Sequence, residues 1–129
     1  MARWASAAFL DGGLDYLAAN ATRMLLVSNY TAGDSYATVL ANSVAEATMA
    51  PGDYTKSSSG LNRLVTTAAG KSATASAGTG ATPDSHIAFT NGSNAVIYVT
   101  DETTNQVVIV GNTVNFPQLT YRSDQPVAP

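Results

Sequence analysis

Short apolar runs alternate with turn-forming residues through the last third of the chain. Runs that are rich in β-branched and aromatic residues and are separated by pairs such as Asn-Gly and Gly-Asn are typical of consecutive antiparallel strands. Four such runs occur at residues 86–89, 95–99, 107–110 and 114–116, and others at 24–28, 61–67 and 119–121. The pattern predicts a mainly β protein, either an antiparallel β-sandwich or a barrel.

One helix is predicted before these strands, from Ser6 to Asn20, with Asp11 as its N-cap. Its apolar face repeats at helical spacing through Leu10, Leu14, Leu17 and Ala21. Residues 36–45 fit a helix through their alanines and a strand through their β-branched residues, and both alternatives stay open. Residues 50–53 predict a turn and 57–60 a flexible connection. The small residues at 68–83 predict an edge strand or a mobile loop.

The composition describes one domain with a weakly charged surface. The chain has 129 residues, which suits a single domain at 1–129 with its own core. Charged residues make up 12% of it, about half the usual fraction, and the net charge is -3. A surface of small neutral polar groups is compatible with dense packing against other protein. Within this domain we expect an N-terminal arm and helix at 1–22 and a C-terminal tail at 122–129.

Several classes of partner and location are disfavoured by the residues that the chain lacks. The six Lys and Arg residues are scattered, and phosphate binding needs a basic stripe, so we expect no nucleic-acid partner. No window is long and apolar enough for a membrane span. Residues 3–10 resemble a short signal peptide, but Asp11 and Asp15 interrupt the apolar stretch and no cleavage site follows. We therefore expect neither a membrane partner nor secretion.

Catalytic and metal-binding motifs are incomplete. Gly70-Lys71-Ser72 resembles a phosphate-binding loop, but Val65 stands where that motif needs glycine. On a strand, Asp84 and His86 face one side and Ser85 the other, so they form no local triad. One histidine and no cysteine disfavour a zinc site. We expect no enzyme, metal or cofactor. Aromatic residues that could stack on sugars or bases, but more often serve as core or interface anchors, are Trp4, Tyr16, Tyr30, Tyr36, Tyr54 and Tyr121.

Residues 10–27 resemble the opening of a family of small tailed-bacteriophage virion proteins. In both, a helix with a Leu-Asp start leads through Asn-Ala-Thr-Arg, here residues 20–23, into a buried strand. The similarity continues through 36–41, 84–89 and 111–117. The resemblance implies a capsid decoration or cement protein, a jelly-roll-type β-sandwich on the outer surface of the virion, made in the bacterial cytoplasm. The partners it implies are the major capsid protein and neighbouring copies in a homo-oligomer.

In such a role the two ends of the chain are the candidate bridging arms. They are residues 2–9 and 122–129, with candidate contact residues Trp4, Phe9, Arg122, Asp124, Pro126 and Pro129. Deleting 122–129 is predicted to weaken attachment to the shell without unfolding the domain. The alternative function is a phage tail or fibre adhesion module that binds a host-surface carbohydrate. A glycan binder should expose aromatic rings along a groove, whereas a cement protein should present apolar or extended termini.

Overall fold

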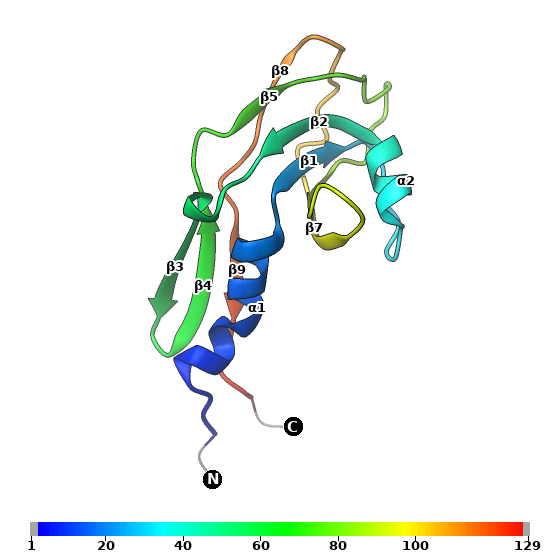
Figure 1. The fold of residues 1–129 in the computed structure, drawn as a ribbon. Coiled ribbons are helices and arrows are strands. Elements are labelled where there is room, and N and C mark those ends of the chain that lie inside the picture. Colours follow the sequence, from blue (N-terminus) through cyan, green and yellow to red (C-terminus); the bar gives the residue numbers. More distant parts are fainter. Residues whose placement is uncertain (1–2, 128–129) are drawn as a thin grey trace.

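The computed structural model describes residues 3–127 and shows an elongated, mainly β molecule (Figure 1). Every strand pair is antiparallel, and a short helix precedes the strands. The predicted fold class is therefore confirmed, while its jelly-roll connectivity stays a prediction. The elements are α1 (Ala7–Asn20), β1 (Arg23–Val27), α2 (Tyr36–Ala41), β2 (Ser43–Thr48), η1 (Pro51–Asp53), β3 (Tyr54–Ser59), β4 (Asn62–Thr67), β5 (Ser72–Thr74), β6 (His86–Thr90), β7 (Val96–Asp101), β8 (Thr113–Asn115) and β9 (Thr120–Ser123).

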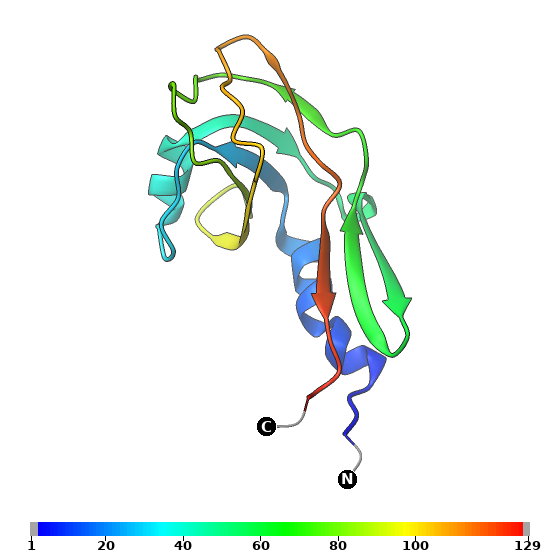
Figure 2. The same cartoon turned by 180° about the vertical axis from the view of Figure 1, so that it is seen from behind.

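The strands form two layers. One layer is the sheet β2-β1-β6-β7, and the other consists of the sheet β3-β4-β9 and the ribbon β5-β8. Figure 2 shows that β4 runs on into β5 while β8 runs on into β9, so the ribbon extends the second sheet. Backbone hydrogen bonds join the two parts, from Phe116 N–H to Lys71 C=O and from Thr67 N–H to Leu119 C=O, both at 2.9 Å. The second layer is thus long and bent.

Strand alternation divides the buried residues of β1 between two clusters. Met24 and Leu26 face the second layer and belong to the main core, whereas Leu25 and Val27 face away from it and pack beneath Val39 of α2. Because both faces of β1 are covered, its apolar run is continuous. The main core also contains Leu14 and Leu17 of α1, Val65 of β4, Ile87 and Phe89 of β6, and Val114 and Phe116 around β8.

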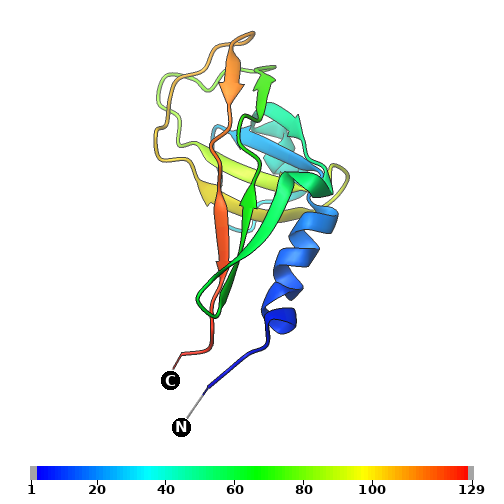
Figure 3. The same ribbon diagram turned by 90° about the vertical axis from the view of Figure 1, so that its left-hand side faces the viewer.

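Helix α1 begins at a different cap from the one predicted. The Ser6 hydroxyl accepts the Phe9 N–H at 3.2 Å and satisfies a donor that lacks a partner within the helix. Asp11 lies in the second turn, so its assignment as the N-cap is wrong. The predicted apolar face is confirmed, because Leu10, Leu14 and Leu17 are buried. Figure 3 shows α1 lying along the sheet of β3, β4 and β9.

The predicted strand at residues 107–110 does not form. Val108 donates its N–H to the Thr79 side-chain oxygen at 2.9 Å and accepts the Thr79 N–H at 3.0 Å. A β ladder does not form here, because Val108 is paired through a threonine side chain where a neighbouring strand would offer a backbone group. The segment's β propensity is therefore not expressed as a strand within the described part of the chain.

One other segment differs from the sequence-based expectation, and two had alternatives that the sequence left open. Residues 57–59, predicted as a flexible connection, are the end of β3 and pair with β4, and the hairpin closes at Gly60, whose φ is +62°. Residues 36–45 contain both of the open alternatives, since α2 ends at Ala41 and β2 begins at Ser43. Within residues 68–83 only β5 is a strand.

Tyr54 connects the end of α1 to β3. Its side chain is buried, and its hydroxyl donates to the Ala21 carbonyl at 2.8 Å. Burial raises the pKa of Tyr54, so the hydroxyl stays protonated and keeps donating. Tyr54→Phe should lower the free energy of unfolding by about 1–2 kcal/mol, because it leaves a carbonyl without this donor. Urea unfolding of the two proteins measures the difference; equal stability would show that the bond contributes nothing.

Candidate interaction surfaces

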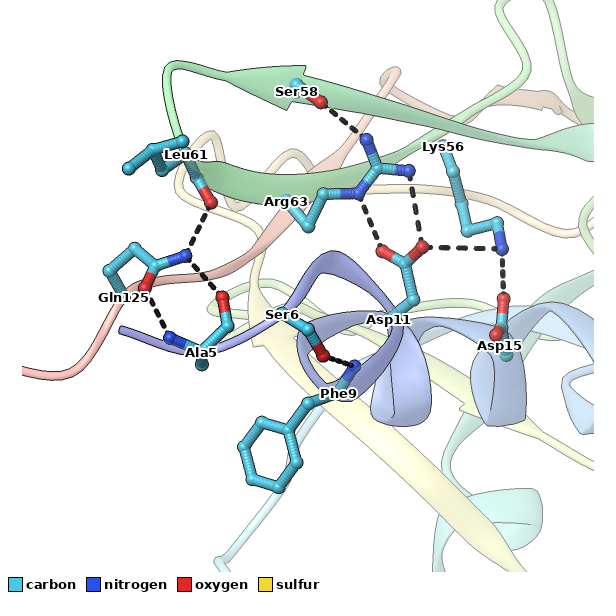
Figure 4. Close-up of polar contacts among 10 residues, drawn as sticks. All are labelled: Ala5, Ser6, Phe9, Asp11, Asp15, Lys56, Ser58, Leu61, Arg63 and Gln125. Atoms are coloured by element: carbon cyan, nitrogen blue, oxygen red, sulfur yellow. Dashed lines mark hydrogen bonds and ion pairs between the residues drawn. The ribbon is translucent and has the colours of Figure 1, made fainter. Parts of the chain in front are cut away.

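The two ends of the described chain meet at one end of the molecule (Figures 1 and 3). Gln125 holds them together (Figure 4). Its side chain accepts the Ala5 N–H at 2.8 Å and donates to the Ala5 and Leu61 carbonyls at 2.9 Å. Its backbone N–H donates to Asn62 Oδ1 at 2.8 Å. Gln125 therefore joins the N-terminal segment, the C-terminal segment and the β3–β4 turn.

The C-terminal tail begins later than residue 122. Arg122 and Ser123 belong to β9 and pair with β4, and Gln125 is bonded as described above. Asp124 and Pro126 are exposed, Arg122 pairs with Asp124 at 3.1 Å, and Pro129 lies outside the described residues. Deleting 122–129 would remove strand pairing as well as the tail. Residues 122–125 are therefore part of the fold, and the expectation that the deletion spares the domain stays a prediction.

Large apolar side chains are exposed at this end of the molecule. Trp4 is 69% exposed and Phe9 77% exposed, and Leu61 and Val127 are also exposed. Trp4 adjoins Ala5, Leu61 shares the Gln125 contact, and Val127 follows Gln125 by two residues. Phe9 lies in the first turn of α1, and its ring points away from Leu61 (Figure 4). We call these four residues the terminal patch. Trp4 and Phe9 were predicted contact residues, whereas Leu61 was missed because its run predicted a strand.

An ion-pair network fixes α1 against the β3–β4 hairpin beside the terminal patch (Figure 4). Arg63 donates to both carboxylate oxygens of Asp11, at 2.8 and 3.2 Å, in the paired geometry typical of strong Arg–carboxylate contacts. Lys56 pairs with Asp15 and lies 3.8 Å from Asp11. The Arg63 hydrogen bonds lower the pKa of Asp11, and the carboxylates raise the pKa of Lys56 and of Arg63. These contacts therefore hold α1, the helix that carries Phe9, against β3 and β4.

Stability should fall in acid because two carboxyl groups have lowered pKa values. Hydrogen bonds from Arg63 lower the pKa of Asp11 below the ordinary 3.8. The pKa of Asp53 is also lowered, by the Ala50 N–H at 2.7 Å and by Lys71 at 3.1 Å. A carboxyl whose pKa is lower in the folded state stabilises the fold above its unfolded pKa, and that contribution disappears as the pH drops through its folded pKa. Denaturant unfolding at about pH 6 and about pH 3 should show the loss.

Asp11→Asn is the matched variant for this experiment. It removes one of the two carboxyl groups, so its stability should change less between the two pH values than that of the unsubstituted protein. If the two proteins lost the same free energy of unfolding in acid, the Asp11–Arg63 pair would have no part in the pH dependence.

A second exposed apolar group lies at the opposite end of the molecule. The loop between β7 and β8, orange in Figure 2, reaches the end far from both termini. It exposes Val107, Ile109 and Val110, which we call the loop patch. These residues were predicted to be a strand, so sequence reasoning found their apolar character but not their exposure. The molecule thus presents apolar side chains at both ends of its long axis.

A groove of about 330 Å³ separates α1 from β7 and β9. It is lined by Tyr16, Tyr98 and Tyr121 with small and aliphatic residues, and the Tyr98 and Tyr121 rings meet edge to face with centroids 5.0 Å apart. Tyr16 and Tyr121 were candidate stacking residues; Tyr98 was missed because its run predicts a core strand. Among the other candidates, Tyr54 is buried and Tyr30 packs against His86.

The lone histidine lies beside two aspartates. His86 pairs with Asp101 across β6 and β7, with Nε2 3.9 Å from the carboxylate, and its Nδ1 lies 3.0 Å from the Asp84 carbonyl. The donor atoms of Asp84, His86 and Asp101 lie within 4.8 Å of one another and could ligate one cation. Such exposed groups are common without an ion, so the cluster carries no assignment. Sequence spacing brought Asp84 and His86 together but not Asp101.

Comparison with protein-family models, curated proteins and solved structures finds no match to this chain. Among the described residues, no helix is long and apolar enough to cross a membrane.

Proposed function

We propose that the protein is a non-enzymatic structural component of a bacteriophage virion, a capsid decoration or cement protein that binds and stabilises the assembled shell. The observation that carries this proposal is the pair of exposed apolar patches at opposite ends of an elongated β structure. Clustered exposed apolar side chains mark interaction sites. Two such sites on one body suit a protein that bridges neighbouring subunits.

Bridging explains how modest patches can hold a protein on a shell. Once the terminal patch binds one capsid subunit, the loop patch meets a copy of the chain held on a neighbouring subunit at a high effective concentration, which favours this second contact. Anything that binds only the assembled lattice shifts the assembly equilibrium toward the shell by mass action. Stabilisation therefore needs no reaction, and the low charged fraction of 12% leaves little repulsion between closely packed copies.

The phage setting is supported by the resemblance of residues 10–27, 36–41, 84–89 and 111–117 to small virion proteins. In this proposal the terminal patch contacts the major capsid protein and the loop patch contacts a neighbouring copy of the chain. The ends of the chain then lie against the outer surface of the shell. Trp4 and Phe9 are the aromatic anchors of that contact, as large aromatic side chains commonly are at interfaces.

Addition of the purified protein to shells depleted of it tests this proposal. The shells should bind the protein to saturation, and their thermal disruption, followed by light scattering, should move to higher temperature. Unassembled capsid subunits are the control and should bind far more weakly, because they offer one contact instead of two. Failure to bind the shells, or equal affinity for free subunits, would refute the proposed cement role.

The groove lined by Tyr16, Tyr98 and Tyr121, called here the tyrosine groove, favours the alternative function, an adhesion module that binds a host-surface carbohydrate. Tyr16 and Tyr121 are exposed and line one hollow, the arrangement expected of a surface that stacks on sugar rings. Host polysaccharide should then bind the unsubstituted protein and a variant in which Trp4 is replaced, but not Tyr121→Ala. This result would support adhesion in place of the cement role.

A further inference from the structure

Ser85 has a buried hydroxyl without a hydrogen-bond partner among the described residues. The residue is 1% exposed, and its backbone is fully engaged: its N–H donates to Asn105 Oδ1 at 2.8 Å and its carbonyl accepts the Glu102 N–H at 2.9 Å. Buried polar groups are nearly always paired, so an orphaned hydroxyl calls for an explanation such as a ligand. These two backbone hydrogen bonds hold Ser85 in place, and its hydroxyl stays unpaired.

Ser85 is one of the residues that line a cavity. Ser85 immediately precedes β6, and alternation places it on the same side as Ile87, facing the second layer. Both residues line a cavity of about 400 Å³ that also reaches Val114 and Phe116 around β8. This volume is within the range of about 300–1,000 Å³ that is usual for small-molecule sites. The cavity is distinct from the tyrosine groove and shares no lining residue with it.

The lining divides into an apolar wall and a polar rim. Leu26, Ile87 and Phe116, all buried, belong to the wall. The rim carries the side chains of Glu102, Thr104, Gln106, Thr113 and Asn115. Hydroxyl and amide groups both donate and accept hydrogen bonds, whereas a carboxylate only accepts. The site thus offers both kinds of hydrogen-bonding group opposite a surface suited to C–H groups.

The charges around the cavity exclude one class of ligand. Within residues 3–127 no Lys, Arg or His lines it, and Glu102 is its only ionisable group. An anionic ligand would be repelled by Glu102 and would find no cation. A sugar-like molecule fits better, because each of its hydroxyls can both donate and accept, and its ring carries a C–H face.

We propose that this cavity binds a small neutral polyhydroxylated ligand, of the size of a mono- or disaccharide, through the Ser85 hydroxyl and the polar rim. The inference does not depend on shell attachment, since neither apolar patch forms the cavity wall. It gives the molecule a binding site besides its two contact surfaces.

Titration of the whole protein with D-glucose, D-galactose and maltose, followed by amide chemical shifts in NMR, tests the proposal. At least one sugar should cause saturable shifts confined to residues around Ser85, Gln106 and Asn115. Glucose 6-phosphate is the anionic comparison and should bind more weakly. Saturable shifts at Tyr16 and Tyr121 instead would assign sugar binding to the groove and overturn the assignment to this cavity, as would the absence of saturable shifts with all three sugars.

Two variants and one control connect binding to the named groups. Ser85→Ala removes a single oxygen and should weaken binding about tenfold, the effect of one lost hydrogen bond. Gln106→Ala alters the exposed rim, where folding is not at stake, and should weaken binding in the same direction. Thr103→Ala, exposed and outside the lining, is the control and should bind like the unsubstituted protein. Full affinity in both cavity variants would refute the site.

Discussion

Replacing Trp4 and Phe9 together by serine should weaken attachment to assembled shells on the order of 1,000-fold, because aromatic anchors that become buried in an interface commonly contribute about 2 kcal/mol each to it. Both side chains are exposed in the isolated protein and lie outside the buried core. The free energy of unfolding should therefore stay nearly unchanged. Quantitative co-sedimentation with shells gives the affinity, and urea unfolding checks the fold.

Leu40→Ser is the matched control for this double variant. Leu40 is also an exposed apolar residue, but it lies on α2 and belongs to neither the terminal patch nor the loop patch. Its replacement should leave shell binding unaltered. Equal effects of the two changes would show that general loss of surface hydrophobicity, and not the terminal patch, governs attachment; no effect of the double variant would remove the patch from the interface.

Leu14→Ala should lower the free energy of unfolding by about 3–4 kcal/mol, the usual effect of removing a fully buried leucine and leaving a cavity. Leu14 is completely buried in the main core, where α1 packs against the second layer. The positions of Phe9 and Asp11 depend on this packing, because both residues are on the same helix as Leu14. Chemical unfolding followed by circular dichroism measures the loss.

Phe9→Ala gives the comparison within the same helix. Its side chain is exposed, so the change in unfolding free energy should stay within about 0.5 kcal/mol, as for most surface substitutions. A loss in Leu14→Ala no larger than the loss in Phe9→Ala would mean that α1 does not belong to the core. The pair thus separates the structural face of the helix from its proposed contact face.

The elements predicted best from the sequence are those in which a local pattern coincides with burial. The spacing of Leu10, Leu14 and Leu17 predicted α1, and the runs at 24–28 and 86–89 predicted β1 and β6, because these strands have covered faces. The segment 107–110 has equally strong β propensity but finds only Thr79 to pair with. Propensity shows what a segment can form, whereas its neighbours decide whether it does.

The candidate sites were only partly predictable for a related reason. Trp4 and Phe9 could be named because they lie in residues 2–9, the segment predicted to be a bridging arm. The contacts that support them join distant parts of the chain: Gln125 bonds Ala5, and Arg63 bonds Asp11. Nothing in local sequence encodes such a pairing. The orphaned Ser85 hydroxyl was equally hidden, because a missing partner is visible only when all neighbours are in place.

The copy number of the protein in purified phage particles, measured by quantitative mass spectrometry against the major capsid protein, tests the proposed cement role. A cement protein that bridges subunits across the lattice should be present in numbers comparable to the capsid protein. A copy number far below it would contradict lattice-wide binding and place the protein in the tail or fibres. Absence from the particle would contradict a structural role in the virion.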